Sequence, residues 1–326
     1  MKNHLKICVI GAGAFGTSLS TIIASRGNSD VTLLGRKASI MQRIKDTRVN
    51  EKALPGINLS PLLNFSSDHT ILQEADIVLF ATSSKGYGDA LNFYKNWLKD
   101  CVQIIICSKG FEYHSGILLS SYSEQVLPSY SISVLSGPGF ARDIAQGFPV
   151  RAVLSSKDIE TSRFLSQILS YNSFQLCCSD DRIGVQIGGA LKNVIAIASG
   201  IVKGRGCGES ACATVMVQGL SEMIKLAEAM GGRSDTILGL SGIGDLILTS
   251  TSKQSRNFCF GVSLGKGEKH TFDQMQLVEG GIAASRVINI STKMGLHLPI
   301  FQAISDVMKN KITVDESLNI ILNYSS

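Results

Sequence analysis

The glycine-rich segment Gly11-Ala12-Gly13-Ala14-Phe15-Gly16 limits the fold of this chain more than any other feature of its sequence. It follows a short apolar run at residues 6–10 and precedes a helical pattern that extends to about residue 26. In such a unit the first glycine allows a tight turn, the second lets the backbone approach a pyrophosphate, and the third packs the helix on the strand. The segment therefore predicts a dinucleotide-binding strand-turn-helix unit, with the anion at the amino terminus of the helix.

The rest of the first half alternates short β-branched runs with helical stretches. Strands are predicted at residues 6–10, 31–34, 77–81, 102–107 and 133–135, with weaker ones at 151–154 and 174–177. This alternation is typical of a doubly wound, Rossmann-type parallel sheet with helices on both faces. Between Arg36 and Ala75, Pro55-Gly56 and Pro61 predict a loop-rich excursion instead.

The second half has a different pattern. After Ser179-Asp180-Asp181 the chain consists of long helical stretches with little β signal. A length of 326 residues also favours two domains. We therefore expect an α/β dinucleotide-binding domain at residues 1–180 and an all-α substrate and catalytic domain at residues 181–326.

Composition excludes several classes of protein. The net charge of +5 comes without basic blocks, so nucleic-acid binding is not expected. Residues 7–25 carry no charge, but their glycines and hydroxyl side chains make a membrane span a poor interpretation. The eight cysteines show no metal-binding spacing, which predicts no metal site and reduced, mostly buried thiols in a cytoplasmic protein. Only 17% of residues are charged, which favours a compact enzyme or an oligomer.

Arg36 stands where the second strand ends. An acidic residue that binds the ribose 2′-hydroxyl of NAD is expected at that position, whereas the sequence reads Leu34-Gly35-Arg36. The arginine predicts a site that accepts or prefers the 2′-phosphate of NADP. The alternative is a solvated loop arginine.

Lys192 is the single charged residue between Ile183 and Val202. Its helical neighbours are mostly small, so a cofactor or substrate has room to approach. Burial would favour the neutral amine and make the residue a general acid or base usable near neutral pH. The alternative is a surface lysine whose apolar stem covers the helix while its amine reaches water.

Other polar groups follow glycine-rich turns or apolar strands. Asp245 closes the turn Ser241-Gly242-Ile243-Gly244 and is either a helix cap or a partner for the amine of Lys192. Ser255-Arg256-Asn257 suits a phosphate monoester. Lys109, in Ser108-Lys109-Gly110, follows a predicted strand, at the sheet edge where such folds bind ligands, and is a second candidate for a phosphate or catalytic contact. The segment 136–141, with Gly137 and Gly139, follows another predicted strand at the same edge.

Taken in this order, the segments resemble those of bacterial-type NAD(P)-dependent glycerol-3-phosphate dehydrogenases over nearly the whole chain. The matching segments are GAGAFGTSLS, LLGR, SKG, SGPGFA, IGVQIGGALKNVIAIASGI, SGIGDLILT, QSRNxxFG and VEG. The resemblance implies reversible hydride transfer between NADPH or NADH and C2 of dihydroxyacetone phosphate. The product, sn-glycerol 3-phosphate, supplies phospholipid synthesis, and a homodimer is expected.

The resemblance also implies roles for individual residues. Lys192 would be the proton donor and acceptor. The positions expected around the substrate are Lys109, Gly137, Gly139, Asn193, Asp245, Thr249, Ser255, Arg256 and Asn257. Those expected to contact the dinucleotide are Ala14, Phe15, Arg36, Ala141, Val278 and Glu279 with the three motif glycines, and Lys109 and Arg256 are shared with the substrate.

The chain departs from the family pattern at Gly139, where a hydroxyl residue is usual, and at Val217-Gln218-Gly219, where the family has Thr-Arg-Gly. These departures bear on substrate affinity and helix packing more than on reaction type. Two other functions compete with the dehydrogenase. One is a reductase of another small carbonyl or 2-hydroxy acid, and the other is a non-catalytic dinucleotide-binding sensor.

Overall fold

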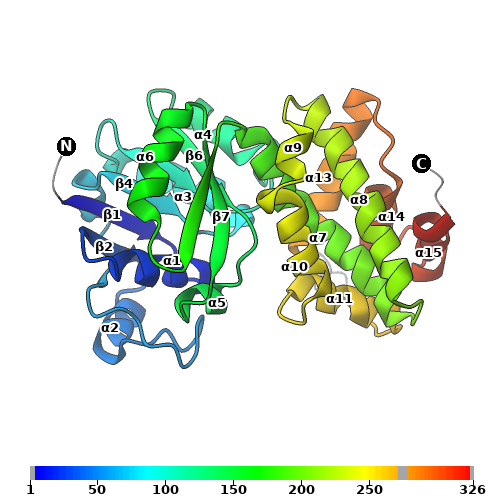
Figure 1. Ribbon diagram of the computed structural model, residues 1–326, viewed down its shortest axis with the longest axis horizontal. Helices are drawn as coiled ribbons and strands as arrows, with labels where there is room; N and C mark the ends of the chain where they lie inside the picture. The colour runs from blue at the N-terminus through cyan, green and yellow to red at the C-terminus, as the bar shows by residue number, and fades with distance from the viewer. Residues whose placement is uncertain (1–3, 271–277, 324–326) are drawn as a thin grey trace. The chain divides into compact units, whose positions relative to one another are not determined.

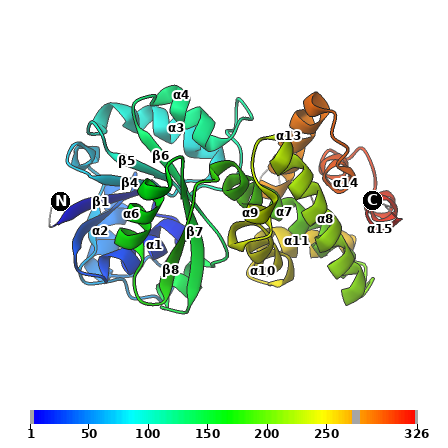
Figure 2. The same cartoon turned by 45° about the horizontal axis from the view of Figure 1, so that its top comes forward.

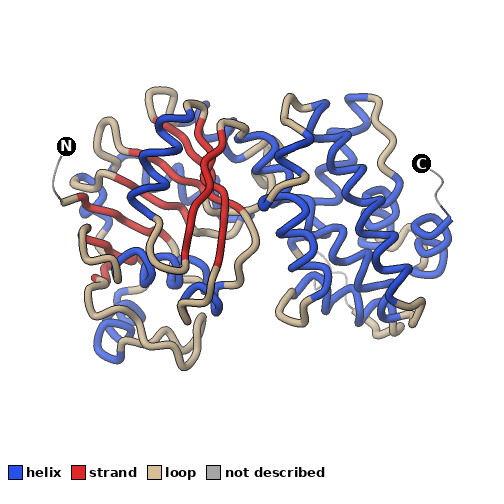
Figure 3. Tube along the Cα trace, in the orientation of Figure 1, coloured by secondary structure: helices blue, strands red, loops and turns tan. Residues whose placement is uncertain are grey.

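The computed structural model describes residues 4–270 and 278–323, which belong to two compact units, Met1–Arg182 and Ile183–Ser326. The first unit combines a sheet with helices, and the described part of the second contains helices without strands (Figures 1 and 3). The predicted fold class is confirmed.

The first unit is built on an eight-stranded sheet with the order β3-β2-β1-β4-β5-β6-β7-β8. The strands are β1 (Leu5–Ile10), β2 (Ser29–Leu34), β3 (Asn64–Ser66), β4 (Ile77–Phe80), β5 (Gln103–Ile106), β6 (Ser131–Ser136), β7 (Val150–Ser156) and β8 (Phe174–Ser179). The chain winds outward from β1 in one direction to β3 and from β4 in the other, so the topological switch point lies between β1 and β4.

Helices cover both faces of this sheet (Figure 2). They are α1 (Ala14–Ala24), α2 (Ala38–Thr47), α3 (Ser84–Tyr94), α4 (Leu119–Val126), α5 (Ala141–Ala145) and α6 (Ile159–Leu169), with short 3-10 turns η1 (His69–Gln73) and η2 (Lys95–Trp97). Leu19 and Ile23 of α1 and Val9 of β1 belong to the same buried hydrophobic core, while Tyr87 of α3 is fully buried and its ring meets Phe80 of β4 edge-on. Burial on both faces explains the continuous apolar runs of the central strands.

The parallel sheet has one exception, because β7 pairs antiparallel with β6 before β8 continues parallel to β7. The connection from Ser136 to Val150 contains only the five-residue helix α5, which packs against α1. A parallel crossover needs a connection that returns along the sheet face. The short helix does not provide one, so β7 starts near the edge where β6 ends and runs back.

The loop-rich excursion expected between Arg36 and Ala75 is wrong in part. It holds helix α2, strand β3 and the 3-10 turn η1, and its longest irregular stretch is residues 48–63. Helix α2 lacks the usual sequence signals of helix ends, because its N-cap, Lys37, makes no side-chain capping bond and its left-handed C-cap is Arg48, with φ of 55°, instead of glycine.

The second unit is a helical bundle around one central helix. Its elements are α7 (Arg182–Gly204), α8 (Glu209–Ala229), α9 (Ser234–Ile237), a π-helical turn η3 (Leu240–Gly244), α10 (Asp245–Thr251), α11 (Arg256–Gly265), α13 (Glu279–Met294), α14 (Pro299–Met308) and α15 (Val314–Asn323). Within residues 4–270 and 278–323, α7 is the one helix long and apolar enough to cross a membrane. The apolar stretch of α7 is 100% buried inside the structure. This burial identifies α7 as a core helix of the bundle.

Close glycine contacts hold the bundle around α7. A Cβ atom on Gly200 would lie 2.3 Å from the carbonyl oxygen of Phe258, and one on Gly261 would lie 2.2 Å from that of Ile197. Nearer the start of α7, a Cβ on Gly280 would lie 2.6 Å from the carbonyl oxygen of Asn193. Since these separations are too short for any side chain, α11 and α13 pack backbone against backbone on α7.

All eight cysteines are free thiols, and no cluster of metal ligands occurs among the described residues. The expectation that most thiols are buried is wrong, because only Cys8, Cys107 and Cys212 are. Burial raises the pKa of the Cys8 and Cys107 thiols, which therefore stay protonated.

Glu222 of α8 is a buried carboxylate that caps a different helix. It accepts hydrogen bonds from the backbone N–H groups of Ile300 (2.9 Å) and Phe301 (3.3 Å), in the first turn of α14, and is 1% exposed. Burial raises its pKa to about 7, against the opposing effect of those two hydrogen bonds and of Lys225. The fold therefore holds a carboxyl group whose charge costs free energy.

This group makes stability depend on pH. Because its pKa is about 7 in the folded protein and 4.5 ordinarily, the folded state binds more protons between these values, and stability falls as pH rises. Over that range we expect Glu222→Gln to gain about 3 kcal/mol relative to the unsubstituted protein. Urea unfolding at a series of pH values measures the difference, and a difference that stays constant from about pH 4 to about pH 8 would contradict the assignment.

Candidate active site

The three motif glycines occupy a turn between β1 and α1 at the carboxyl edge of the sheet. Gly11 has φ of +115°, and a Cβ there would lie 2.7 Å from the carbonyl oxygen of Ala81 at the end of β4. A Cβ on Gly16 would lie 2.0 Å from the carbonyl oxygen of Gly11, so only glycine lets α1 pack on the turn. A Cβ atom on Gly13, by contrast, would have no neighbouring atom within 4 Å. Two glycines thus shape the turn and the third leaves open space.

That open space fits the pyrophosphate of a dinucleotide. Gly13 is the N-cap of α1 and has no side-chain capping bond, so the first N–H groups of the helix, at Ala14 and Phe15, have no side-chain cap. Such a helix terminus carries a partial positive charge and attracts anions. Residues Ala12 to Phe15 are half-buried or exposed, which leaves the terminus accessible.

Asn50 supports this turn, a role that no local sequence pattern indicates. Its amide nitrogen donates to the carbonyl oxygen of Ala12 (3.0 Å) and to Oγ1 of Thr17 (2.9 Å), and the residue is 3% exposed. Asn50 lies in the irregular segment 48–63, so only the folded chain brings it beside the glycine-rich turn. We infer that it fixes the backbone that faces the anion.

Arg36 follows β2 at the same edge of the sheet and is exposed, as is Lys37 beside it. The next element is α2, whose N-cap is Lys37. Two cations at the end of β2 provide the charge that a 2′-phosphate requires.

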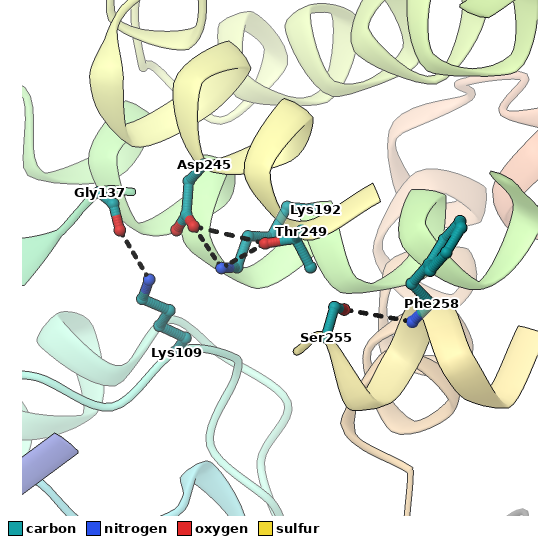
Figure 4. A network of polar contacts seen from close by, with 7 residues as sticks. All are labelled: Lys109, Gly137, Lys192, Asp245, Thr249, Ser255 and Phe258. Atoms are coloured by element: carbon teal, nitrogen blue, oxygen red, sulfur yellow. Dashed lines mark hydrogen bonds and ion pairs between the residues drawn. The ribbon is translucent and has the colours of Figure 1, made fainter. Parts of the chain in front are cut away.

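Lys109 lies after β5, and its Nζ atom donates to the carbonyl oxygen of Gly137 (3.1 Å), which lies after β6 (Figure 4). Gly137 has φ of +142°, and a Cβ there would lie 2.9 Å from Cα of Ala152. The helix that begins at Ala141, α5, follows directly. Lys109 therefore tethers two loops at the carboxyl edge of the sheet.

Glu112 organises the loop that carries Lys109. Its carboxylate accepts hydrogen bonds from the backbone of Ser115 (2.6 Å) and His114 (2.9 Å) and from the hydroxyl of Ser115 (2.7 Å). Burial favours the neutral acid, but these bonds outweigh it and hold the pKa of Glu112 below its ordinary value. Gly88 makes room for this carboxylate, because a Cβ there would lie 2.7 Å from Oε1 of Glu112.

Gly139 departs from the family pattern for a packing reason. A Cβ atom there would lie 2.9 Å from Cγ1 of Val150 and 3.4 Å from Cδ1 of Ile144. The branched side chain of Val150 occupies the space that a hydroxyl residue would need. The first unit therefore has no side-chain hydroxyl at this position.

Lys192 lies at the centre of a buried polar cluster in the second unit. The residue is 8% exposed, and its Nζ atom contacts the carboxylate of Asp245 and Oγ1 of Thr249 (2.9 Å) (Figure 4). Asp245 is 1% and Thr249 4% exposed. The alternative of a surface lysine is wrong. Asp245 is the first residue of α10, after the N-cap Gly244, and it holds the amine instead of capping the helix.

The chemistry of this cluster follows from its burial. A carboxylate beside a buried amine favours the ammonium form, whereas loss of water favours the neutral amine. Thr249 lies one helical turn after Asp245 and accepts a second hydrogen bond from the amine, so the direction of Nζ is fixed. An amine held in this way is suited to exchange a proton with an oxygen atom of a bound ligand.

A second cluster lies at the amino termini of α11 and α13. Ser255 is the N-cap of α11, and its hydroxyl accepts a hydrogen bond from the N–H of Phe258 (3.2 Å; Figure 4). Arg256 follows with a side chain 91% exposed, 4.0 Å from the carboxylate of Glu279 at the start of α13. Asn257 accepts a hydrogen bond from the N–H of Gly280 (3.1 Å). Two helix termini and an exposed guanidinium suit a phosphate group.

The described residues thus bring most predicted site positions of the second unit into two clusters. Val278, the N-cap of α13, belongs to the second cluster. Among the described residues, the side chain of Asn193 makes no hydrogen bond to the lysine cluster. It is buried on α7, and its carbonyl oxygen faces Gly280.

Comparisons with known proteins agree with this arrangement. Residues 6–162 match the model of the NAD-dependent glycerol-3-phosphate dehydrogenase N-terminus, and residues 181–319 match that of the C-terminus. The chain is 47% identical over 313 residues to glycerol-3-phosphate dehydrogenase [NAD(P)+] of Rhizobium johnstonii, covering 96% of this chain and 95% of that one.

Solved structures give the same result. The crystal structure of glycerol-3-phosphate dehydrogenase from Coxiella burnetii matches with a TM-score of 0.92 and 28% identity, over 98% of this chain and 99% of that one. The glycerol-3-phosphate dehydrogenase of Saccharomyces cerevisiae matches with a TM-score of 0.84 and 25% identity, over 97% and 99% of the two chains.

Proposed function

Because the chain belongs to the NAD-dependent glycerol-3-phosphate dehydrogenase family, we propose that Lys192 exchanges the proton in its reaction. The chain is an oxidoreductase that uses NAD or NADP to interconvert dihydroxyacetone phosphate and sn-glycerol 3-phosphate. We further propose that this product supplies glycerophospholipid synthesis. The observation that carries the proposal is the buried amine of Lys192, fixed between Asp245 and Thr249.

The reaction needs a proton at one oxygen atom. When bound, the reduced nicotinamide supplies the hydride that adds to C2 of the ketone. Lys192 gives a proton to the oxygen on C2 as negative charge develops there, and takes it back in the reverse direction. Asp245 stabilises the ammonium form before transfer, and Thr249 directs Nζ. Asn193 is proposed to line the same site.

The second cluster is proposed to hold the substrate phosphate. Ser255 and Asn257 lie at the amino terminus of α11, a ten-residue helix, and Arg256 projects from its first turn. The guanidinium suits a bidentate contact with phosphate oxygens. Lys109, Gly137 and Gly139 are proposed to contact the substrate from the loops after β5 and β6.

Residues 1–180 are proposed to form the dinucleotide-binding domain and residues 181–326 the substrate and catalytic domain. The pyrophosphate of the dinucleotide fits the open amino terminus of α1 beside Gly13, and Arg36 favours NADP over NAD. The further positions proposed to contact it are Gly11, Ala14, Phe15, Gly16, Lys109, Ala141, Arg256, Val278 and Glu279.

We also propose a homodimer in the cytoplasm. Val217, Leu238 and Ile247 of the second unit are 67%, 55% and 50% exposed, and only 17% of the chain is charged. Large exposed apolar side chains favour association. Eight free thiols are compatible with a reducing compartment.

Replacing Lys192 tests the proposal. Lys192→Ala removes the proton donor, so kcat for dihydroxyacetone phosphate reduction should fall about a hundredfold to ten-thousandfold, while the Kd for NADPH stays unchanged. Stopped-flow oxidation of NADPH and fluorescence titration measure the two quantities. The matched control is Lys203→Ala, on the same helix but bound to Glu209 at the surface, which should keep the original kcat. A Lys192→Ala variant that retains kcat would refute the role.

Replacing Arg256 tests the phosphate site. Arg256→Ala loses a charge-assisted contact, so the KM for dihydroxyacetone phosphate should rise about tenfold to a hundredfold. The rate with unphosphorylated dihydroxyacetone should stay the same, because that substrate makes no such contact. An unchanged KM for the phosphate ester would point to a reductase of another small carbonyl.

Replacing Arg36 tests cofactor preference. Arg36→Asp exchanges the cation for a carboxylate, which repels a 2′-phosphate and accepts a hydrogen bond from a 2′-hydroxyl. The ratio of kcat/KM for NADPH to that for NADH should therefore fall at least about tenfold, as expected for loss of one ionic contact. A ratio that stays the same in steady-state assays would show that Arg36 does not contact the 2′ position.

A further inference from the structure

The π-helical turn η3 packs on α7 one helical turn before Lys192. A Cβ atom on Gly188 would lie 2.3 Å from the carbonyl oxygen of Ser241 and 3.0 Å from Cα of Gly242. Gly188 and Lys192 are four residues apart and so lie on the same face of α7. The face that carries the amine is therefore also the face on which η3 rests.

The turn η3 is fixed from its other side as well. A Cβ atom on Gly242 would lie 2.0 Å from the carbonyl oxygen of Ile237, the last residue of α9. Within the turn, the N–H of Gly244 donates to the carbonyl oxygen of Gly239 (3.2 Å), the five-residue spacing of a π-helix. Glycine contacts on both sides thus hold η3 between α7 and α9.

The position of η3 decides where Asp245 lies, because α10 begins at Asp245 directly after Gly244. We propose that Gly188 is a positioning residue: its missing side chain lets η3 approach α7 closely enough for Asp245 to hold the amine of Lys192. This inference rests on the proposed role of Lys192. A methyl group at position 188 would push η3, and Asp245 with it, away from the amine.

The charges around the amine set the expected pH effect. Among the described residues of this unit, Asp245 is the charged group seen to face Lys192 from α10. Glycines also bring two other helices close to this stretch of α7, at Gly219 of α8 and Gly280 of α13. The nearest carboxylates on those two helices face elsewhere, Glu222 toward α14 and Glu279 toward Arg256. Moving Asp245 away would therefore favour the neutral amine.

The experiment compares Gly188→Ala with Gly200→Ala in the full chain. Gly200 is a matched control, because a Cβ there also overlaps a carbonyl oxygen, that of Phe258, at 2.3 Å. It lies eight residues beyond Lys192, about 12 Å along the helix, and contacts α11. Dihydroxyacetone phosphate reduction is measured at saturating NADPH from about pH 6 to about pH 10, together with the melting temperature of each variant.

For Gly188→Ala we expect kcat to fall about tenfold to a hundredfold, with KM within about twofold, and the alkaline limb of the kcat profile to move to lower pH by about one unit. Gly200→Ala should lower the melting temperature similarly and leave the pH profile unchanged. The variant Gly242→Ala, which displaces η3 through α9, should reproduce the shifted limb.

The inference is overturned if Gly188→Ala keeps the original profile, or if Gly200→Ala shifts it equally. It is also overturned if Gly188→Ala and Gly242→Ala both fail to fold while Gly200→Ala folds, since the contact would then serve folding alone. A Lys192→Ala variant that keeps its kcat refutes the proposed function instead. Loss of activity in Lys192→Ala with an unshifted Gly188→Ala profile refutes only the positioning role.

Discussion

The ion pair between Lys192 and Asp245 is the interaction on which the interpretation of the second unit depends. A lysine 8% exposed and an aspartate 1% exposed are each costly to bury alone. Together, with Thr249 as a further partner of the amine, they form a charged group whose polar atoms are satisfied away from bulk water. Replacing such a pair with apolar side chains is often neutral or stabilising, so its presence points to chemistry more than to stability.

The packing of α7 makes this pair possible. Glycines on α7, η3, α11 and α13 let backbones meet without side chains between them, so the helix is surrounded along nearly its whole length. Backbone contacts leave little freedom for adjustment, since they lack flexible side-chain atoms that could move aside. The amine is therefore presented by a rigid element, as precise proton transfer requires.

Some features of the two units could be predicted from the sequence and others could not. The glycine-rich turn and the main strands were predictable because their signals are local: three spaced glycines and short apolar runs. Lys192 could be identified as a candidate site residue because it is the single charged residue in a long apolar stretch. Helix α2, the antiparallel β7, Asn50 and the cap formed by Glu222 were not, since each depends on partners distant in the chain. The sequence showed Gly188 only as one of the small neighbours of Lys192, because its contact with Ser241 exists only in the folded protein.

A crystal structure of the protein with NADP⁺ and sn-glycerol 3-phosphate bound together would test the role of Lys192 at the atoms that react. In that complex we expect Nζ of Lys192 within hydrogen-bond distance, about 3 Å, of the oxygen on C2 of the substrate, while it still contacts Asp245. A complex in which that amine is turned away from the substrate, with another group bound to the C2 oxygen, would contradict it.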